Sequence, residues 1–551
     1  MKSGQFKLKK TDHIGASSAE QDLEFLSKCF IDTGDLEVLA DINDHRQILL
    51  GRAGSGKTAL IEKLKWTHDE NVIVIEPENL ALTFISNSTI LQFFSKLGVN
   101  LDPFFKLLWR HVLTVEILKR HFSIVEQNGE PSLIKKLKRM FSGDSREDRE
   151  AQEAIAYIQD WGESFWEETE FRVKEISQKL ENSLSSEIGA ELGLSGAKIK
   201  GALNSGEKLT EEQKSKLVNR GQEIVSKAQV QDLHKVITLL DTVLSNKHKQ
   251  YFIVVDSLDE NWVEESLRYR LIMALILTSR DFYKVKNAKV IVALRRDLVE
   301  RVFKLTRESG FQEEKFQSLY VPLKWSKEDL IKVLDTRISY LVSRRYTKQT
   351  VTHLDLLPKS YRRTPITDYL CRIVERPRDV VAFFNFCILE GANSSRLKTA
   401  EIKNAEGEYS RSRLRALGDE WNSNFPALIK FTKVFQRKPN SFKLETITDG
   451  EIEELCLSVA AENPSGQGVL QQNAMKVVDL VITAKEFKIL LARVYYRVGL
   501  IGLKTSSYES EFWADELGRS LASAEIDIQT NIIVHPMYHR ALGVDISKKK
   551  K

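Results

Sequence analysis

The chain has 551 residues, of which 42% are hydrophobic and 29% charged, so it can bury the cores of about three or four domains. Its 82 basic and 77 acidic residues leave a formal net charge of only +5, which excludes a basic surface over the whole protein and confines any nucleic-acid contact to a local patch. The four cysteines are far apart and form no C-x-x-C pair, and the N-terminal stretch lacks the apolar segment of a signal peptide. We therefore expect a reduced, cytoplasmic protein without a zinc module or a membrane span.

The first residues are expected to lead into a buried strand. Residues 1–15 are polar and predict a loose segment, whereas residues 19–43 carry apolar side chains at helical spacing. The short apolar run Ile48-Leu49-Leu50 follows and predicts the first strand.

That strand runs directly into Gly51-Arg-Ala-Gly-Ser-Gly-Lys57-Thr58, which has the G-x-x-x-x-G-K-[ST] spacing of a P-loop and precedes an apolar helical pattern. Glycines at 51, 54 and 56 let the backbone curl so that successive N–H groups, including that of Ser55, face an anion at the positive end of the helix. Lys57 is expected to reach the β- and γ-phosphates and the Thr58 hydroxyl to ligate Mg²⁺. The alternative is a glycine-rich turn without a ligand.

Residues 71–75 (NVIVI) predict the second strand, but the third does not begin until residue 251. An interval of this length is far longer than an ordinary crossover, so residues 85–247 are expected to form a helical insertion. Alternating small and polar residues at 185–209 favour a β-hairpin at its tip, and a flexible linker is the alternative.

The run Tyr251-Phe-Ile-Val-Val-Asp256 is typical of a buried parallel strand that ends in an acid. Because the carboxyl ends of parallel strands meet at one edge of a sheet, Asp256 is expected beside the P-loop, where it would hold Mg²⁺. Asp259 or Glu260 would then orient and deprotonate the attacking water. The same acids would also suit the N-terminus of a helix.

Together, GRAGSGKT and VVDSLDENW resemble the additional-strand P-loop NTPases, and the D-S-L-D-E spacing is similar to that of the STAND and KAP-type branch close to the AAA+ proteins. The resemblance implies an ATPase in which an acid three positions after the strand-end aspartate serves hydrolysis. It also implies a bacterial protein of a kind associated with defence against phage.

A further strand is predicted at 288–295, ending in Arg295, and a fifth at 318–323. Five strands separated by helices predict a parallel three-layer α/β core over residues 1–345, interrupted by the insertion. By resemblance to STAND proteins Arg295 would reach the γ-phosphate, with a solvated basic loop as the alternative. Arg301 and Arg307 lie where AAA+ proteins often place an arginine finger.

Residues 346–400 are expected to form a helical lid. The segment Glu375-Arg-Pro-Arg378-Asp resembles the helix start of AAA+ lids in which an arginine contacts the nucleotide. Arg378 is the candidate, although the unusual residues before the proline leave Arg376 as the alternative.

After a charged link at 400–414, residues 415–551 predict a separate domain in which helices are followed by short strands, the order of a winged helix. The helix predicted at 484–497 carries Lys485, Lys488, Arg493 and Arg497, which suit a phosphate backbone. A winged helix that binds protein is the alternative.

These patterns predict an ATP-binding and ATP-hydrolysing switch that uses ATP and Mg²⁺ and controls the assembly or activity of a partner, with an antiviral role implied by resemblance alone. The expected partners are further copies of the chain, a separate effector protein, or both. The alternatives are an origin-recognition-like ATPase whose C-terminal domain binds duplex DNA, and a scaffold that holds nucleotide without hydrolysing it.

Overall fold

The computed structural model describes residues 6–80, 91–92, 97–121, 249–260, 262–305, 313–463, 466–506, 508, 510–514 and 525–546, and scattered positions between 152 and 244. The chain divides into two compact units. The core unit is Asp32–Lys324, and the helical unit is Met1–Ile31 together with Trp325–Lys551. Nearly all of the hairpin predicted at 185–209 lies outside the described residues.

A parallel sheet of five strands forms the centre of the core unit, in the order β2-β3-β4-β1-β5. The strands are β1 (Ile48–Gly51), β2 (Val72–Ile75), β3 (Tyr251–Val255), β4 (Ala288–Arg295) and β5 (Tyr320–Pro322). Every pairing is parallel, and the register sets Gly51 opposite Arg295. The predicted parallel α/β core is confirmed. All residues of β3 are buried, as expected of a strand covered on both faces.

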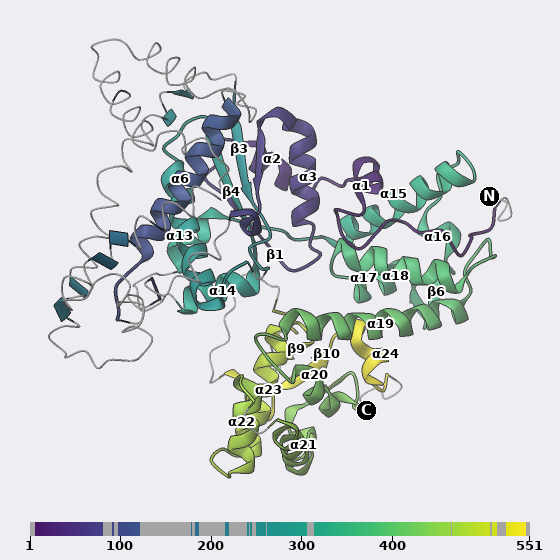
Figure 1. The fold of residues 1–551 in the computed structure, drawn as a ribbon. Coiled ribbons are helices and arrows are strands. Elements are labelled where there is room, and N and C mark those ends of the chain that lie inside the picture. The colour runs from purple at the N-terminus through teal and green to yellow at the C-terminus, as the bar shows by residue number, and fades with distance from the viewer. Residues whose placement is uncertain are drawn as a thin grey trace. The chain divides into compact units, whose positions relative to one another are not determined.

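Helices cover both faces of this sheet (Figure 1). On one face, α6 (Asp102–His121), α13 (Glu265–Phe282) and α14 (Arg296–Leu305) share a single apolar core with alternate strand residues such as Ile253 and Val292. On the other face lie α2 (Asp35–Ala40) and α3 (Lys57–His68), and His68 of α3 packs against Phe252 at 5.0 Å between ring centroids. Short 3₁₀ helices at Asp69–Asn71, Pro77–Leu80 and Glu313–Leu319 complete the described connections.

The N-terminal segment belongs to the helical unit. Ile14 and Leu8 are completely buried, and Asp22 forms a buried ion pair of 2.6 Å with Arg337. Residues 6–15 are therefore packed, in contrast to the loose segment that their polarity predicted. The helical pattern at 19–43 is divided between α1 (Leu23–Cys29) in this unit and α2 in the core unit.

A bundle of helices follows the core unit in the chain: α15 (Lys327–Arg345), α16 (His353–Leu356), α17 (Ile366–Ile373), α18 (Pro377–Glu390) and α19 (Thr399–Trp421), with a two-stranded ribbon of β6 (Ser360–Tyr361) and β7 (Thr364–Pro365). Ser326 caps the start of helix α15, because its Oγ accepts the Asp329 N–H at 3.0 Å. The charged link predicted at 400–414 is wrong: these residues lie inside α19, whose Ile402, Ala405 and Tyr409 are buried.

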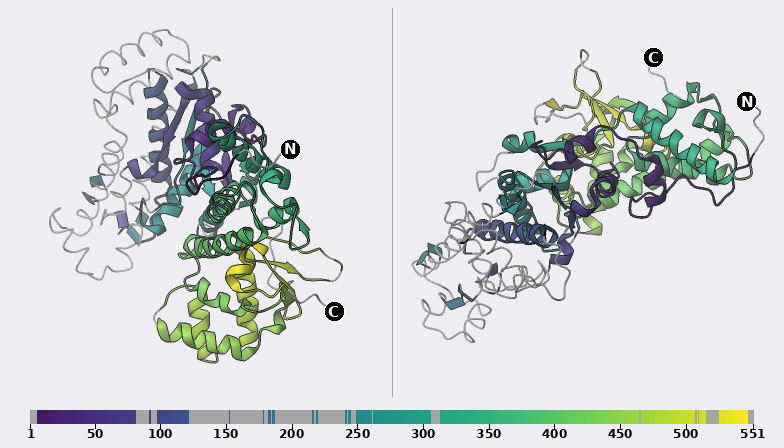
Figure 2. Two further views of the ribbon diagram at one scale, coloured as in Figure 1. Left: turned by 90° about the vertical axis from the view of Figure 1, so that its right-hand side faces the viewer. Right: turned by 90° about the horizontal axis from the view of Figure 1, so that it is seen from above.

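The C-terminal residues form helices α20 (Leu428–Phe431), α21 (Asp449–Glu462), α22 (Val469–Val478), α23 (Ala484–Arg497) and α24 (His539–Leu542) with an antiparallel sheet (Figure 2). Its strands β8 (Ser441–Lys443), β9 (Ile501–Lys504) and β10 (Asn531–Val534) have the order β8-β10-β9. Their buried residues continue the apolar core of the bundle. Within the described ranges, the helices all lack the long apolar run that a membrane span requires.

Candidate functional site

The glycine-rich stretch forms a loop between the end of β1 and the start of α3, as its sequence predicted. Gly54 and Gly56 have φ angles of 77° and 102°, a region that side-chain-bearing residues rarely adopt. A Cβ at Gly51 would collide with Oγ of buried Ser55. These glycines are therefore required by the turn itself, and the loop ends at the positive end of α3, a common place for a phosphate group.

Lys57 and Thr58 occupy the first turn of α3. The ammonium group of Lys57 donates to the carbonyl oxygens of Gly51 and Arg52, each at 3.3 Å, and so lies against the loop. Burial lowers the pKa of Lys57, while the negative charges of Asp259 and Asp256 act in the opposite direction. The side chain is thus a cation held between the loop and the acids that follow β3.

Asp256 follows β3 at the carboxyl edge of the sheet, and its N–H donates to the Ile75 carbonyl of the neighbouring strand at 3.3 Å. Ser257 then takes a φ of 57°, which turns the chain sharply. The charge of Asp256 acts on Lys57. A carboxylate here and the Thr58 hydroxyl are both oxygen ligands of the kind Mg²⁺ prefers, so this pair suits the ion when phosphate oxygens and water complete its shell.

Two hydrogen bonds hold the turn after Asp256. The indole N–H of buried Trp262 donates to the Leu258 carbonyl at 3.1 Å, and the guanidinium of Arg268 on α13 donates to the Glu260 carbonyl at 2.8 Å. Both bonds are accepted by backbone carbonyl oxygens and do not involve the carboxylates of Asp259 and Glu260. These two residues are exposed at the edge of the sheet.

Arg295 ends β4 directly opposite Gly51. Its guanidinium forms two hydrogen bonds with Asp297, each at 3.0 Å, and a third with Asp259 at 3.2 Å. The structure therefore brings Arg295, Asp259 and Lys57 into one charged cluster. Asp297 is a member of this cluster that the sequence analysis did not predict.

Glu260 lies near two further acids that were not predicted, Glu76 and Glu78. Burial raises the pKa of Glu260, and the charges of Glu78 and Asp259, together with a hydrogen bond to Glu78, add to this effect. Both new acids directly follow β2, which pairs with β3. Their positions at the end of an apolar run were the signal available in the sequence.

The other candidate arginines have partners elsewhere. Arg301 donates to Glu265 at 2.7 Å and to the Tyr269 hydroxyl at 2.5 Å, and Arg307 lies outside the described residues. Arg378 belongs to the helical unit, where its Nε donates to the Ser17 carbonyl at 2.9 Å. Arg376 contacts Asp379 at 3.2 Å in the same unit.

The basic helix α23 is largely buried. Lys488 is only 5% exposed, and it donates to the Ile447 carbonyl at 2.8 Å and pairs with Asp449 at 2.6 Å. Lys485, Arg493 and Arg497 are exposed, and the Arg497 guanidinium lies over the Trp421 and Phe425 rings. Lys488 therefore has a structural role, which its spacing in the sequence did not reveal.

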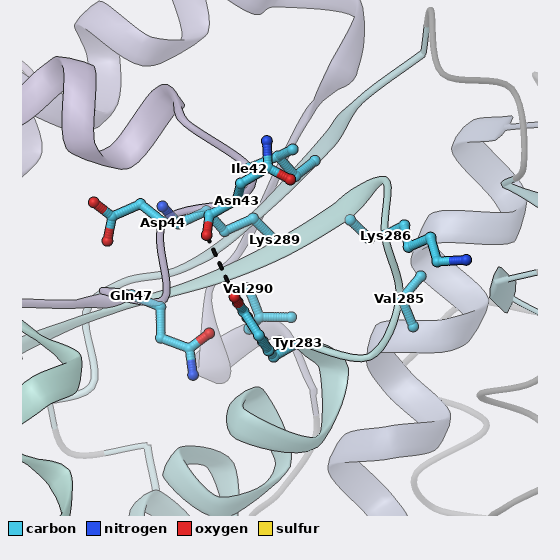
Figure 3. A pocket seen from close by; sticks show the side chains of 10 residues that line it. Ile42, Asn43, Asp44, Gln47, Tyr283, Val285, Lys286, Lys289 and Val290 are labelled. Carbon is cyan, nitrogen blue, oxygen red and sulfur yellow. Dashed lines mark hydrogen bonds between the residues drawn. The ribbon is translucent and has the colours of Figure 1, made fainter.

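A separate pocket of about 180 Å³ lies at the amino ends of β1 and β4, the opposite edge from the P-loop (Figure 3). Lys289 lines it and donates to the carbonyls of Val38 and Asp41 at 2.7 Å each, which caps the end of α2. Burial lowers the pKa of Lys289 to about 8. Because ligands of parallel α/β sheets bind beyond the carboxyl ends of the strands, this pocket is distinct from the candidate site.

Two comparisons with known proteins found a match, one over part of the helical unit and one over nearly the whole chain. Residues 328–418 match the model of the FunZ-associated C-terminal helical domain. This stretch begins in α15 and ends in α19. Over 546 residues the chain is 20% identical to the "Putative transposon gamma-delta 80.3 kDa protein" of Escherichia coli (strain K12), and the match covers 97% of this chain and 68% of that protein. The chain is thus similar to a transposon-associated protein along nearly its whole length.

Proposed function

We propose that this chain is an ATP-binding and ATP-hydrolysing switch that controls the assembly or activity of a partner. The observation that carries the proposal is the P-loop itself: Lys57 lies against the loop carbonyls and within the electrostatic reach of Asp256, Asp259 and Arg295. Bound Mg²⁺ and ATP would supply the phosphoanhydride to be cleaved and a cation that neutralises its charge.

In this proposal the loop from Gly51 to Gly56 and Lys57 bind the phosphates, and Thr58 and Asp256 hold the metal. Glu260 is a better candidate than Asp259 for the water-activating base, because its pKa is raised whereas Asp259 is paired with Arg295. Arg295 is proposed to contact the terminal phosphate, and Arg378 retains its proposed role as a lid arginine.

We further propose that the C-terminal residues 415–551 contain the expected winged-helix-like domain. Among the described residues, three α-helices between β8 and β9, and a sheet in the order β8-β10-β9, support this. The proposed partner is a protein, either another copy or a separate effector. The burial of Lys488 removes one of the four cations of α23 from possible contact with duplex DNA, which weakens the DNA-loading alternative.

The proposed cellular setting is bacterial cytoplasm, with a role in defence against phage. The match to a FunZ-associated helical domain and the similarity to a transposon-associated protein are compatible with a protein of mobile or defence elements.

The test is equilibrium binding of ATP to the full chain. Lys57→Ala removes the cation of the loop and is expected to weaken ATP binding at least about tenfold, the scale of a hydrogen bond to a charged group. Lys65→Ala, on the same helix but paired with Glu62, is the matched control and should bind as the wild type does. Equal affinity in the wild type and in Lys57→Ala would contradict the assignment.

A further inference from the structure

The guanidinium of Arg295 is held in one orientation. Asp297 takes its Nε and one terminal nitrogen, at 3.0 Å each, which leaves the other terminal nitrogen to meet Asp259 at 3.2 Å. The Arg295 and Asp297 side chains are 16% and 14% exposed, whereas Asp259 is 39% exposed. Two-point pairing fixes a guanidinium more firmly than one-point pairing does, so Asp297 is the anchor and Asp259 the looser partner.

Asp259 also acts on the second cation of the site. Among the neighbouring charges, that of Asp259 has the largest effect on the pKa of Lys57. One partly exposed carboxylate therefore pairs with the strand-end arginine and also acts on the P-loop lysine. In the proposed function these two cations, Lys57 and Arg295, bind the phosphates of ATP. The terminal phosphate, like the Asp259 carboxylate, carries negative charge and acceptor oxygens.

We propose that Asp259 is an internal substitute for the terminal phosphate of ATP, and that the site distinguishes ATP from ADP by exchanging Asp259 for that phosphate. In this proposal Asp259 pairs with Arg295 whenever no terminal phosphate competes for it. A triphosphate competes with Asp259 for Arg295, whereas a diphosphate lacks the group that would do so. Asp297 is a positioning residue that keeps Arg295 directed at the site throughout. This inference rests on the proposed function.

The two acids should therefore have opposite effects on selectivity. Asp259→Asn removes the competing charge, so affinity for the triphosphate should rise about three- to tenfold, as for a partly exposed ion pair, with a smaller change for ADP. Asp297→Asn loosens Arg295, so affinity for the triphosphate should fall by about the same factor while affinity for ADP is unchanged. Asp297→Glu keeps the carboxylate and should restore part of the loss.

The experiment is calorimetric titration of the full chain with ADP and with the non-hydrolysable imidotriphosphate analogue of ATP, in the presence of Mg²⁺. Asp102→Asn is the control, because it breaks an ion pair of 3.0 Å between α6 and α13 that involves Arg270 and neither Arg295 nor Lys57. A purely structural role for the acids would change the two affinities by equal factors.

The expected result is that the ratio of the two affinities increases in Asp259→Asn and decreases in Asp297→Asn. Binding with an unchanged ratio in both variants would overturn this inference and leave the proposed function intact. If the wild type binds neither nucleotide, the proposed function fails, and the inference fails with it.

Discussion

Glu260 and Asp259 are adjacent in the sequence, but their surroundings differ. Asp259 accepts a hydrogen bond from Arg295, whereas Glu260 is grouped with other acids that raise its pKa. A carboxylate with a raised pKa is the stronger base, so Glu260 is expected to take the proton of the attacking water.

Glu260→Gln keeps the size of the side chain and removes its basic oxygen. The variant should bind ATP with wild-type affinity and hydrolyse it about 100-fold more slowly, the loss expected for a general base. Phosphate release measured beside ATP binding separates the two effects. Undiminished hydrolysis would transfer the role to another acid.

Lys289 gives a prediction about pH. Its folded-state pKa of about 8 lies below the ordinary lysine value, so above pH 8 the unfolded chain retains a proton that the folded protein has released. The free energy of unfolding should therefore rise with pH between about 8 and 10, by up to about 3 kcal/mol.

The comparison is denaturant unfolding of the wild type and of Lys289→Met across this range, because the other titrating groups cancel in the difference. The stability of the wild type relative to the variant should increase as pH rises. A difference that is independent of pH would show that Lys289 stays protonated.

At the scale of single residues, the sequence predicted those residues whose role follows from the local backbone conformation or from the position in a strand. The glycines at 54 and 56 are needed for positive φ angles, and Asp256 ends a buried strand, so both could be inferred from local pattern. The position of Glu78 after an apolar run was visible in the sequence, but its effect on Glu260 was not, because it depends on a contact between distant segments. The pairing of Asp297 with Arg295 depends on side-chain geometry where β4 turns into α14.

Among the elements, the N-terminal segment is joined to α15 by a buried ion pair between Asp22 and Arg337. Arg337 lies on α15, is buried with Asp22, and also donates to the Ile14 carbonyl at 2.9 Å. Asp22→Ala leaves this arginine buried without its counter-charge and should lower the free energy of unfolding of the helical unit by about 3 kcal/mol.

Glu24→Ala is the matched control on the same helical segment. Glu24 pairs with Arg344 but its side chain is 60% exposed, so its loss should cost less than about 1 kcal/mol. Denaturant unfolding of the full chain measures both variants. Equal losses would mean that burial does not govern the strength of the first pair.

Substitutions on helix α23 should separate effects on stability from effects on DNA binding. Lys488→Ala removes the bonds to Ile447 and Asp449 and should destabilise the protein by about 1 to 3 kcal/mol. Lys485→Ala with Arg493→Ala should leave stability unchanged, because both side chains are exposed. If the full chain bound duplex DNA through them, the double variant would flatten the log–log dependence of affinity on salt by up to about two units.

Our proposal instead expects weak DNA binding by the wild type, without a change of salt dependence in the double variant. Tight, salt-sensitive binding that the double variant reduces would favour the DNA-loading alternative.

At the level of elements, helix α23 has the range that its sequence pattern predicted, and short strands follow it as expected. Helix α22 and strand β8 were missed. Strand β8 has only three residues, too few to show alternation, and α22 is a short helix between turns. The buried face of α19 was also missed, because its charged residues dominate the sequence at 400–414.

On the scale of the whole molecule, the core unit is an insertion in the sequence of the helical unit. The chain leaves the helical unit after Ile31 and returns to it at Trp325, and α1 packs with α15 just outside these two points. Hydrophobic pattern predicted the parallel α/β core but placed the lid and the C-terminal residues in separate domains, whereas residues 325–551 belong to one compact unit. It did not predict that the first 31 residues join the second unit, because that association depends on packing between segments about 300 residues apart in the sequence.

The most direct test of an ATP-driven switch is phosphate release from γ-labelled ATP by the full chain with Mg²⁺, with and without candidate partners. The account predicts release that Lys57→Ala abolishes, that Glu260→Gln slows about 100-fold, and that Lys65→Ala leaves unchanged. Release that persists in Lys57→Ala, or a wild type that binds ATP but releases no phosphate with any partner, would contradict it.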